Sequence, residues 1–319
     1  MCKRVLAVII AIICMAGVSS GCYNRRLDLQ SEPYTNLTKN SDGTYSCLIS
    51  SRTNEKFKQA IAKVEHPESI KTMNILAYDG EDIIDITPLA LFENLEELEL
   101  IAATNDLTPL ASLTKLGFLV IRGGSQEGGT PPIKNVEEGF LDLTPLAFLK
   151  ELKHLRIEPH NKFAINDMTP LGSLTKLEYL DLWSKSSQMS DITVITSLVC
   201  LKELRLSGCQ ISDIAPLNLL TDLEKLDLSR NTISDLSPLA SLTNLKELDL
   251  ADNSIDDAVC LASLENLEWL NLSYNKINDI TPFKSLTGLK KLYLSGNNIT
   301  GTSVDDLKKA LPDCEITSY

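Results

Sequence analysis

The sequence predicts an α/β solenoid, with a curved sheet of short parallel strands on its concave side and 3-10 or irregular turns on its convex side. A phrase of 22 residues recurs between Leu201 and Asn297, and a fixed period of this size is typical of stacked repeats. Each phrase begins LxxLxLxxNxI, so its apolar residues alternate as in a strand that buries one face. One phrase cannot bury its own leucines, so stacking must build the core. The phrases begin at Leu201, Leu223, Leu245, Leu267 and Leu289.

An asparagine follows the strand in most phrases, where the chain must turn away from the sheet. We expect its amide to bond backbone groups of the turn and of the adjacent repeat, because a buried polar group without a partner costs about 1–3 kcal/mol. Cys209 takes this place in one phrase. The asparagines are Asn231, Asn253, Asn275 and Asn297.

The second half of each phrase carries an aspartate and a proline, as in the segment from Asp235 to Leu239. Proline has a fixed φ and no N–H group, so this half favours short helical turns over a second sheet. Aspartate and serine are abundant in the sequence as residues of these turns.

The phrases resemble the leucine-rich repeat of the 22-residue class, and are most similar to the internalins of bacterial surfaces and to the related phosphatase regulatory-subunit class. The LxxLxLxxNxI lines and the recurring DITPL, DLTPL, DIAPL and DLSPL carry the resemblance, which covers about Ile70 to Asn298. The resemblance implies a horseshoe fold with a helical N-terminal cap. It implies a binding surface without naming the ligand, because the displayed side chains choose the partner.

The N-terminus has the features of an export signal. Lys3 and Arg4 precede the apolar run from Val5 to Val18, which is shorter than the ~20 residues that a spanning helix needs. The sequence around Gly21 and Cys22 resembles the bacterial lipoprotein box, which would place a lipid on Cys22. We therefore expect an exported protein at the bacterial cell surface, anchored to a membrane through Cys22, with ordinary cleavage and secretion as the alternative.

Five segments are predicted along the chain. The stretch after the signal is polar and lacks a hydrophobic period, which indicates a flexible tether. Phe57, Ile61 and Val64 then recur at helical spacing, as in a cap over the first leucine layer. The segments are a lipoprotein-like signal peptide (1–21), a flexible tether (22–46), an N-terminal helical cap (47–69), the leucine-rich repeats (70–301) and a C-terminal cap (302–319).

Three consecutive repeats of the irregular N-terminal half carry extensions beyond the 22-residue phrase. The largest excess contains glycine and proline pairs, which no packed element would tolerate, so it must form a loop that leaves the solenoid. Equivalent positions stack, so we expect the three extensions to lie along one edge. They run from Arg122 to Phe140, from Pro159 to Phe163 and from Lys185 to Gln188.

Composition and motifs argue against several functions. The net charge of -13 and the pI near 4.8 argue against a nucleic-acid partner, which requires a basic face. The motifs of zinc peptidases, serine hydrolases, P-loop proteins and CxxC redox proteins do not occur. His154 and His160 are expected to be solvated. We therefore predict a protein that is not an enzyme and that uses no cofactor or metal.

Five cysteines remain beyond Cys22, at no metal-site or disulfide-framework spacing. We expect free, buried thiols, with a disulfide among them as the open alternative in an exported protein. They are Cys47, Cys200, Cys209, Cys260 and Cys314.

The outward-facing positions of the strands hold the candidate binding residues. Large aromatics on an exposed sheet face require a reason, and aromatics with arginine are enriched in binding hot spots. A second, weaker patch combines Trp269, Tyr274 and Tyr293. The candidates are Phe118, Arg122, His154, Arg156, Tyr179, Trp183, Trp269 and Tyr293.

These residues predict a protein ligand, bound through the concave face and the loops of the N-terminal half. Two alternatives stay open. A cell-wall or host glycan would stack on the rings of Tyr179, Trp183 and Trp269. In the other alternative, the aromatics pack beneath the long loop as a satellite cluster and bind nothing.

Overall fold

The computed structural model describes residues 34–41, 43–51, 53–77, 83–123, 137–183 and 189–318. The chain divides into a unit at residues 1–32 and a unit at residues 33–319, and every described residue belongs to the second. The predicted signal peptide, Cys22 and the first part of the predicted tether lie outside the described residues.

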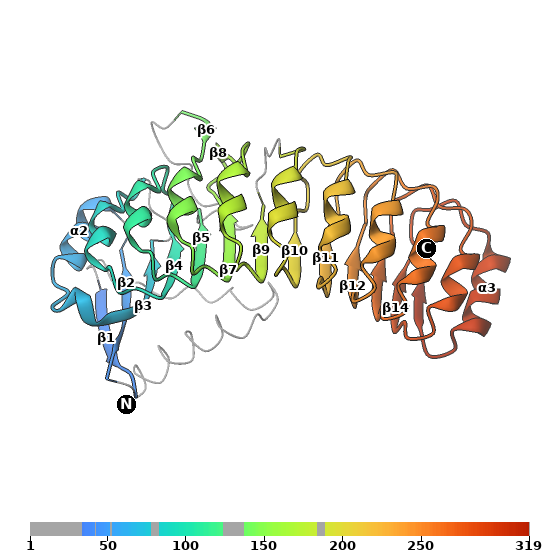
Figure 1. The fold of residues 1–319 in the computed structure, drawn as a ribbon, viewed down its shortest axis with the longest axis horizontal. Coiled ribbons are helices and arrows are strands. Elements are labelled where there is room, and N and C mark those ends of the chain that lie inside the picture. Colours follow the sequence, from blue (N-terminus) through green and yellow to red (C-terminus); the bar gives the residue numbers. More distant parts are fainter. Residues whose placement is uncertain are drawn as a thin grey trace. The chain divides into compact units, whose positions relative to one another are not determined.

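One sheet of 13 strands runs through the second unit, in the order β1-β2-β3-β4-β5-β7-β9-β10-β11-β12-β13-β14-β15 (Figure 1). Neighbouring strands are parallel except β1 and β2, which are antiparallel. The strands are β1 (Tyr34–Lys39), β2 (Tyr45–Ser50), β3 (Ile70–Leu76), β4 (Glu97–Ile101), β5 (Phe118–Arg122), β7 (His154–Glu158), β9 (Tyr179–Leu182), β10 (Glu203–Arg205), β11 (Lys225–Asp227), β12 (Glu247–Asp249), β13 (Trp269–Asn271), β14 (Lys291–Tyr293) and β15 (Glu315–Thr317).

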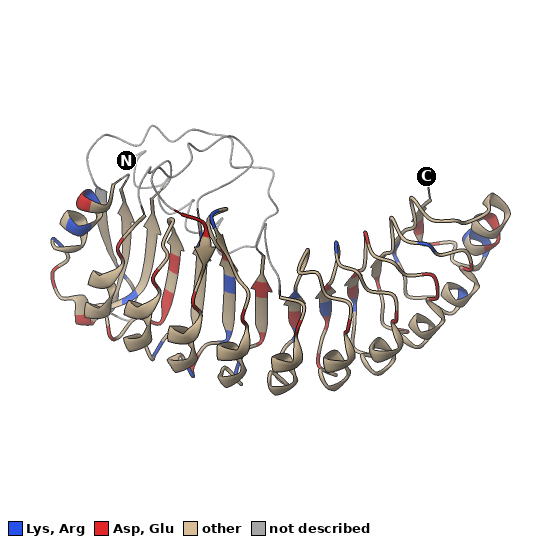
Figure 2. Cartoon of the chain, turned by 90° about the horizontal axis from the view of Figure 1, so that it is seen from above, with Lys and Arg blue, Asp and Glu red and all other residues tan. Residues whose placement is uncertain are grey.

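Short 3-10 turns form the opposite, convex side of this unit, and the strands form the concave side (Figure 2). From the second turn onward, an aspartate precedes each turn and its Oδ1 accepts the N–H of the first turn residue at 2.8–2.9 Å. The predicted solenoid is thus confirmed. The turns span Pro67–Ser69, Thr87–Leu91, Thr108–Ser112, Thr144–Phe148, Thr169–Ser173, Thr193–Ser197, Ala215–Leu219, Ser237–Ser241, Val259–Ser263 and Thr281–Ser285.

Leucines of equivalent positions stack into one continuous core. Leu204 pairs in register with Leu226, and Leu248 with Leu270, and these side chains are at most 2% exposed. Each buried aliphatic side chain contributes roughly 1.5–3 kcal/mol before the entropy of ordering is subtracted. The repeats therefore hold each other together, and no single repeat has a core of its own.

The turn asparagines join neighbouring repeats as predicted. Oδ1 of Asn253 accepts the N–H of Ile233 at 3.0 Å, and its Nδ2 donates to the carbonyls of Leu228 and Leu250 at 3.0 and 3.1 Å. Asn231, Asn275 and Asn297 make the equivalent bonds.

The N-terminal end combines a hairpin with a helix. Helix α2 (Asn54–Ile61) is capped by the Thr53 side chain, which accepts the N–H of Lys56, and its Phe57 is fully buried. Residues 34–46 were expected to belong to a flexible tether, and this expectation was wrong. They include β1 and the start of β2, because β2 pairs with β3 and extends the sheet.

The C-terminal end is covered by helix α3 (Gly301–Ala310), which buries Val304 and Leu307 against the core. Strand β15 follows and pairs with β14. Apart from Gly301, both elements fall within the segment predicted as a C-terminal cap (302–319).

A second, two-stranded sheet forms beside the long repeats. Its strands are β6 (Gly139–Phe140) and β8 (Phe163–Ala164), which pair in parallel. The ends of the first two predicted extensions therefore lie side by side. Residues 124–136 and 184–188 lie outside the described part of the chain.

Candidate binding surface

Three aromatic rings stack across adjacent strands of the concave sheet face. The sheet registers Phe118 of β5 with His154 of β7, and His154 with Tyr179 of β9. The first two ring centroids are 4.3 Å apart with planes 14° apart, and the second two are 3.9 Å apart with planes 7° apart. The guanidinium of Arg205 lies 6.0 Å from the Tyr179 ring centroid. We call Phe118, His154 and Tyr179 the aromatic ladder.

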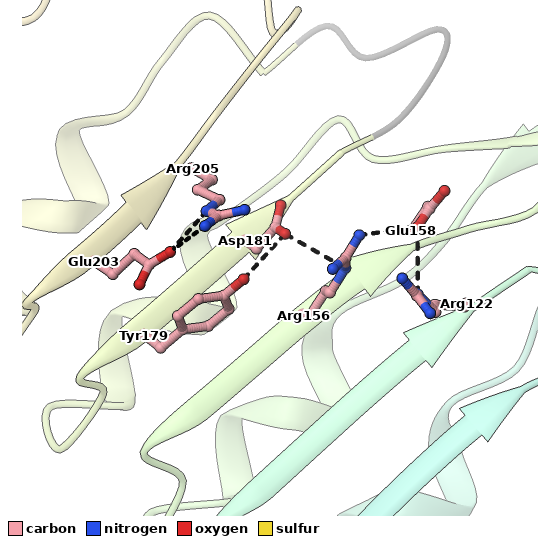
Figure 3. Close-up of polar contacts among 7 residues, drawn as sticks. All are labelled: Arg122, Arg156, Glu158, Tyr179, Asp181, Glu203 and Arg205. Carbon is pink, nitrogen blue, oxygen red and sulfur yellow. Dashed lines mark hydrogen bonds and ion pairs between the residues drawn. The ribbon is translucent and has the colours of Figure 1, made fainter. Parts of the chain in front are cut away.

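A row of alternating charges lies next to Tyr179 of the ladder (Figure 3). Its members are Arg122, Glu158, Arg156, Asp181, Arg205 and Glu203. Oε2 of Glu158 lies 3.6 Å from Nε of Arg122 and 3.4 Å from Nη2 of Arg156. Asp181 joins the row to the ladder, because its Oδ2 accepts the Tyr179 hydroxyl at 3.2 Å and lies 3.4 Å from Nε of Arg156. We call these six residues the charge row.

Two donor atoms of the charge row are attracted by nearby carboxylates without forming a directed hydrogen bond. Nε of Arg122 and Nε of Arg156 lie within ion-pair distance of carboxylates, but neither donates a hydrogen bond of good geometry to a described residue. A buried donor without an acceptor costs about 1–3 kcal/mol. These arginines are therefore not placed for the best internal bonding.

Desolvation dominates the acid–base chemistry of this surface. Burial raises the pKa of the Asp181 and Glu99 carboxyls, although nearby arginines oppose the shift in both. Burial, together with the charge of Asp181, also raises the pKa of the Tyr179 phenol. Burial, together with the charge of Arg156, lowers the pKa of His154 from 6.5 to about 4. The polar groups of this surface are thus partly desolvated, as are those at the centre of a protein interface.

The expectation that His154 and His160 are solvated was wrong. The His154 ring has an aromatic neighbour on both faces, and His160 is only 8% exposed. Nδ1 of His160 accepts the N–H of Lys162 at 3.2 Å. Burial lowers the pKa of His160 as well.

The predicted candidates fall into three places. Phe118, His154 and Tyr179 form the ladder, and Arg122 and Arg156 belong to the charge row. Trp183 lies just beyond the end of β9, where its backbone N–H donates to the Ile157 carbonyl at 3.0 Å, and it is not part of the ring stack. Trp269 and Tyr293 lie on β13 and β14, with centroids 5.6 Å apart and planes 52° apart.

The candidate set from the sequence omitted four members of the charge row: Glu158, Asp181, Glu203 and Arg205. The repeat alignment contained a signal for two of them. The sheet registers Arg122 with Glu158 and Arg156 with Asp181, so opposite charges occupy equivalent positions of neighbouring repeats. Cross-strand pairs of this kind stabilise a sheet.

The cysteines are free, as expected. Cys47 and Cys209 are buried, but Cys200 is exposed and Cys260 and Cys314 are half-buried, so the expectation of five buried thiols was wrong in part. Cys260 and Cys314 pack against the leucine core without being fully buried, and Cys200 is not part of it. Burial raises the pKa of Cys47 to about 11.

Across the described ranges, no group of three or more histidine, cysteine, aspartate or glutamate side chains is placed to hold a metal ion. In that same part of the chain, no helix is long and apolar enough to span a membrane.

Comparison with known proteins places the repeats in a family. Residues 199–241, 221–263 and 265–309 match the family Leucine Rich repeats (2 copies). The crystal structure of internalin C2 from Listeria monocytogenes matches with 30% identity and a TM-score of 0.54, over 66% of this chain and 83% of internalin C2. A second internalin from this organism, InlF, matches with 23% identity and a TM-score of 0.61, over 86% of this chain and 82% of InlF. No curated protein matches.

Proposed function

This chain belongs to the internalin-like leucine-rich-repeat proteins, and from that premise we propose that it is a surface-anchored or secreted protein that binds another protein through the aromatic ladder and the charge row. Leucine-rich-repeat proteins generally bind protein partners. The proposed role is binding and not catalysis, because the ionisable groups of the surface pair with each other and with ring neighbours.

The aromatic ladder is the observation that carries this proposal. A solenoid needs leucine on the core side of each strand, but its fold does not need three rings on the outward side of adjacent strands. Half-buried rings next to arginines are the residues that dominate binding energy when a partner covers them. The ladder is also rigid, because each ring is held by the next, so little side-chain entropy remains to be lost on binding.

The charge row favours a partner with a matching pattern of charges over any partner of opposite net charge. Its three arginines and three carboxylates balance, so the row does not draw in ligands of one sign. A partner must instead match the alternating pattern, since burying an unmatched charge is costly. Specificity would then come from the order of charges along the strands.

The geometry of the ladder does not favour glycan binding at this surface. A sugar would stack on a free ring face, but both faces of His154 and one face of Tyr179 are covered by neighbouring rings. The Arg205 guanidinium lies on Tyr179 as well. Apart from the outer face of Phe118, the ladder therefore offers ring edges to a ligand.

The capture of proteins by the full-length chain tests this function. The immobilised chain is exposed to extracts of bacterial envelope and of host cell surfaces, in parallel with His154→Ala. We expect a protein that the wild type retains and that His154→Ala retains poorly, because removal of the middle ring leaves both outer rings unsupported. Lys225→Ala, on the neighbouring regular half, serves as a control that should retain the same protein. Equal capture by His154→Ala would contradict the proposal.

A further inference from the structure

Tyr274 presents a ring to solvent at a position where the fold does not require one. The residue before each turn asparagine adopts a left-handed backbone, with φ of 58° at Arg230, 57° at Asp252, 57° at Tyr274 and 72° at Gly296. The turn therefore dictates this conformation, and an arginine, an aspartate and a glycine all satisfy it. A bulky ring is unfavourable in this region, and such strain concentrates at functional sites. Tyr274 is nevertheless 65% exposed.

The next repeat leaves room for this ring. A Cβ atom built on Gly296 would lie 2.6 Å from Cδ1 of Tyr274, so the phenol ring rests directly on the backbone of Gly296. The glycine supports the ring from one side. The ring remains open to solvent on its other side, as its exposure shows.

Two further rings lie on the strands of the same two repeats. Tyr293 lies three residues before Gly296, on β14, and is 5.6 Å from the Trp269 ring of β13. Their planes are 52° apart, so these two rings do not cover each other face to face as the ladder rings do. We call Trp269, Tyr293 and Tyr274 the aromatic strip.

The surroundings of the strip are polar. The other outward positions of these two strands and of the residues that follow them are Asn271, Ser273, Lys291 and Ser295. The Asn271 amide donates to Oδ2 of Asp249 at 3.4 Å, and burial raises the pKa of that carboxyl. No aliphatic side chain is among the outward positions of β13 and β14. A protein hot spot favours a water-excluded apolar setting, which the strip does not provide.

We propose that the aromatic strip binds an oligosaccharide of β-linked pyranose units. A pyranose has a C–H face that makes dispersion contacts with an open ring face, and hydroxyl edges that bond to amides, hydroxyls and carboxylates. Both kinds of partner occur here side by side. Trp269 and Tyr293 lie on adjacent strands of one sheet face, and Tyr274 lies in the turn that follows β13, so a chain that reaches all three must be extended, as β-linked chains are. This site is separate from the ladder and does not depend on protein binding there.

Tryptophan fluorescence tests the site directly, because the sequence contains only Trp183 and Trp269. In full-length protein carrying Trp183→Phe, Trp269 is the only emitter. Cellohexaose and chitohexaose are titrated as β-linked probes and maltohexaose as the α-linked probe, each to about 10 mM, which would saturate a millimolar site. We expect a saturable change in emission with at least one β-linked probe, and a response at least tenfold weaker with maltohexaose.

Two variants assign the response to the strip. Tyr274→Asn removes the ring while keeping a residue that tolerates the left-handed backbone, so the turn should stay folded. It should weaken binding at least tenfold, whereas Arg230→Asn, at the same turn position two repeats earlier, should bind like the parent. The absence of any emission change with all three probes, or an undiminished response in Tyr274→Asn, would overturn the proposal. Loss of a captured protein in Tyr274→Asn without any oligosaccharide binding would also overturn it, since the strip would then be a protein contact.

Discussion

The imidazole of His154 lies parallel to the phenol ring of Tyr179, with centroids 3.9 Å apart and planes 7° apart. Burial of the imidazole, together with the charge of Arg156, disfavours the imidazolium, so the pKa of His154 falls to about 4 in the folded protein from 6.5 in a free chain. Between these values the unfolded chain binds a proton that the folded chain does not. Stability contributed by His154 is therefore complete above pH 6.5 and is lost as the pH falls towards 4.

This relation predicts how the free energy of unfolding depends on pH. Between about pH 7 and pH 4.5, the wild type should lose roughly 1–3 kcal/mol more stability than His154→Phe, which keeps a ring but cannot titrate. Denaturant titrations of both proteins at each pH measure the difference. Carboxyls such as Asp85, whose pKa the Lys58 ammonium lowers to about 2, titrate equally in both proteins and cancel. If the free energy of unfolding depends on pH identically in the two proteins, His154 is not desolvated.

The asparagine ladder predicts a large effect from one amide. Asn253→Ala removes the acceptor of the Ile233 N–H and the donor to two carbonyls, so it should destabilise the protein by about 1–3 kcal/mol. Lys246→Ala is the control, because its exposed ion pair with Glu224 contributes at most about 1 kcal/mol. Thermal denaturation of the two variants compares them. If both melt at the same temperature, the asparagine has no structural role.

The backbone of Gly123 packs so closely against a neighbouring segment that no side chain fits there. A Cβ there would meet the backbone of His160 and of Pro159, and the Gly123 N–H donates to the Glu158 carbonyl at 2.7 Å. Gly123→Ala should therefore cost about 1–3 kcal/mol through overpacking. Gly301→Ala, in open space in the first turn of α3, should be neutral or stabilising by up to about 1 kcal/mol. Chemical denaturation distinguishes the pair, and the account fails here if Gly123→Ala is as stable as the wild type.

Cys22 predicts where the protein resides. If a lipid is attached to this residue, labelled palmitate should be incorporated into the wild type, and Cys22→Ala should be released into the medium. More than one acyl chain gives stable membrane attachment, whereas one gives only marginal binding. Wild-type protein found in the medium with an unmodified terminus would instead indicate secretion.

Much of this fold could be predicted because each contact recurs at the equivalent position of every repeat. The register of Leu204 with Leu226 and the bonds of Asn231 follow from a phrase that recurs, so every copy supports the others. The hairpin of β1 and β2 has no such support. Residues 34–46 are polar, and strands form among them because β2 pairs with β3, which no local pattern reveals.

The site was predicted less completely, for a similar reason. The sequence placed Phe118, His154 and Tyr179 on the outward face, but their stacking depends on three strands being in register across repeats of unequal length. His154 was therefore expected to be solvated, whereas its ring stacks between two others. The membership of Asp181 in the charge row likewise depends on lateral pairing with Arg156.

The most direct test of the binding function is the affinity of Tyr179→Ala for the protein that the wild type captures, measured by calorimetry with Trp269→Ala in parallel. Tyr179→Ala should weaken binding by about 1–4 kcal/mol, the range for a buried interface anchor, whereas Trp269→Ala should bind like the wild type. An unchanged affinity for Tyr179→Ala, together with a sharply lower melting temperature, would show that the ladder only packs within the fold and would contradict the account.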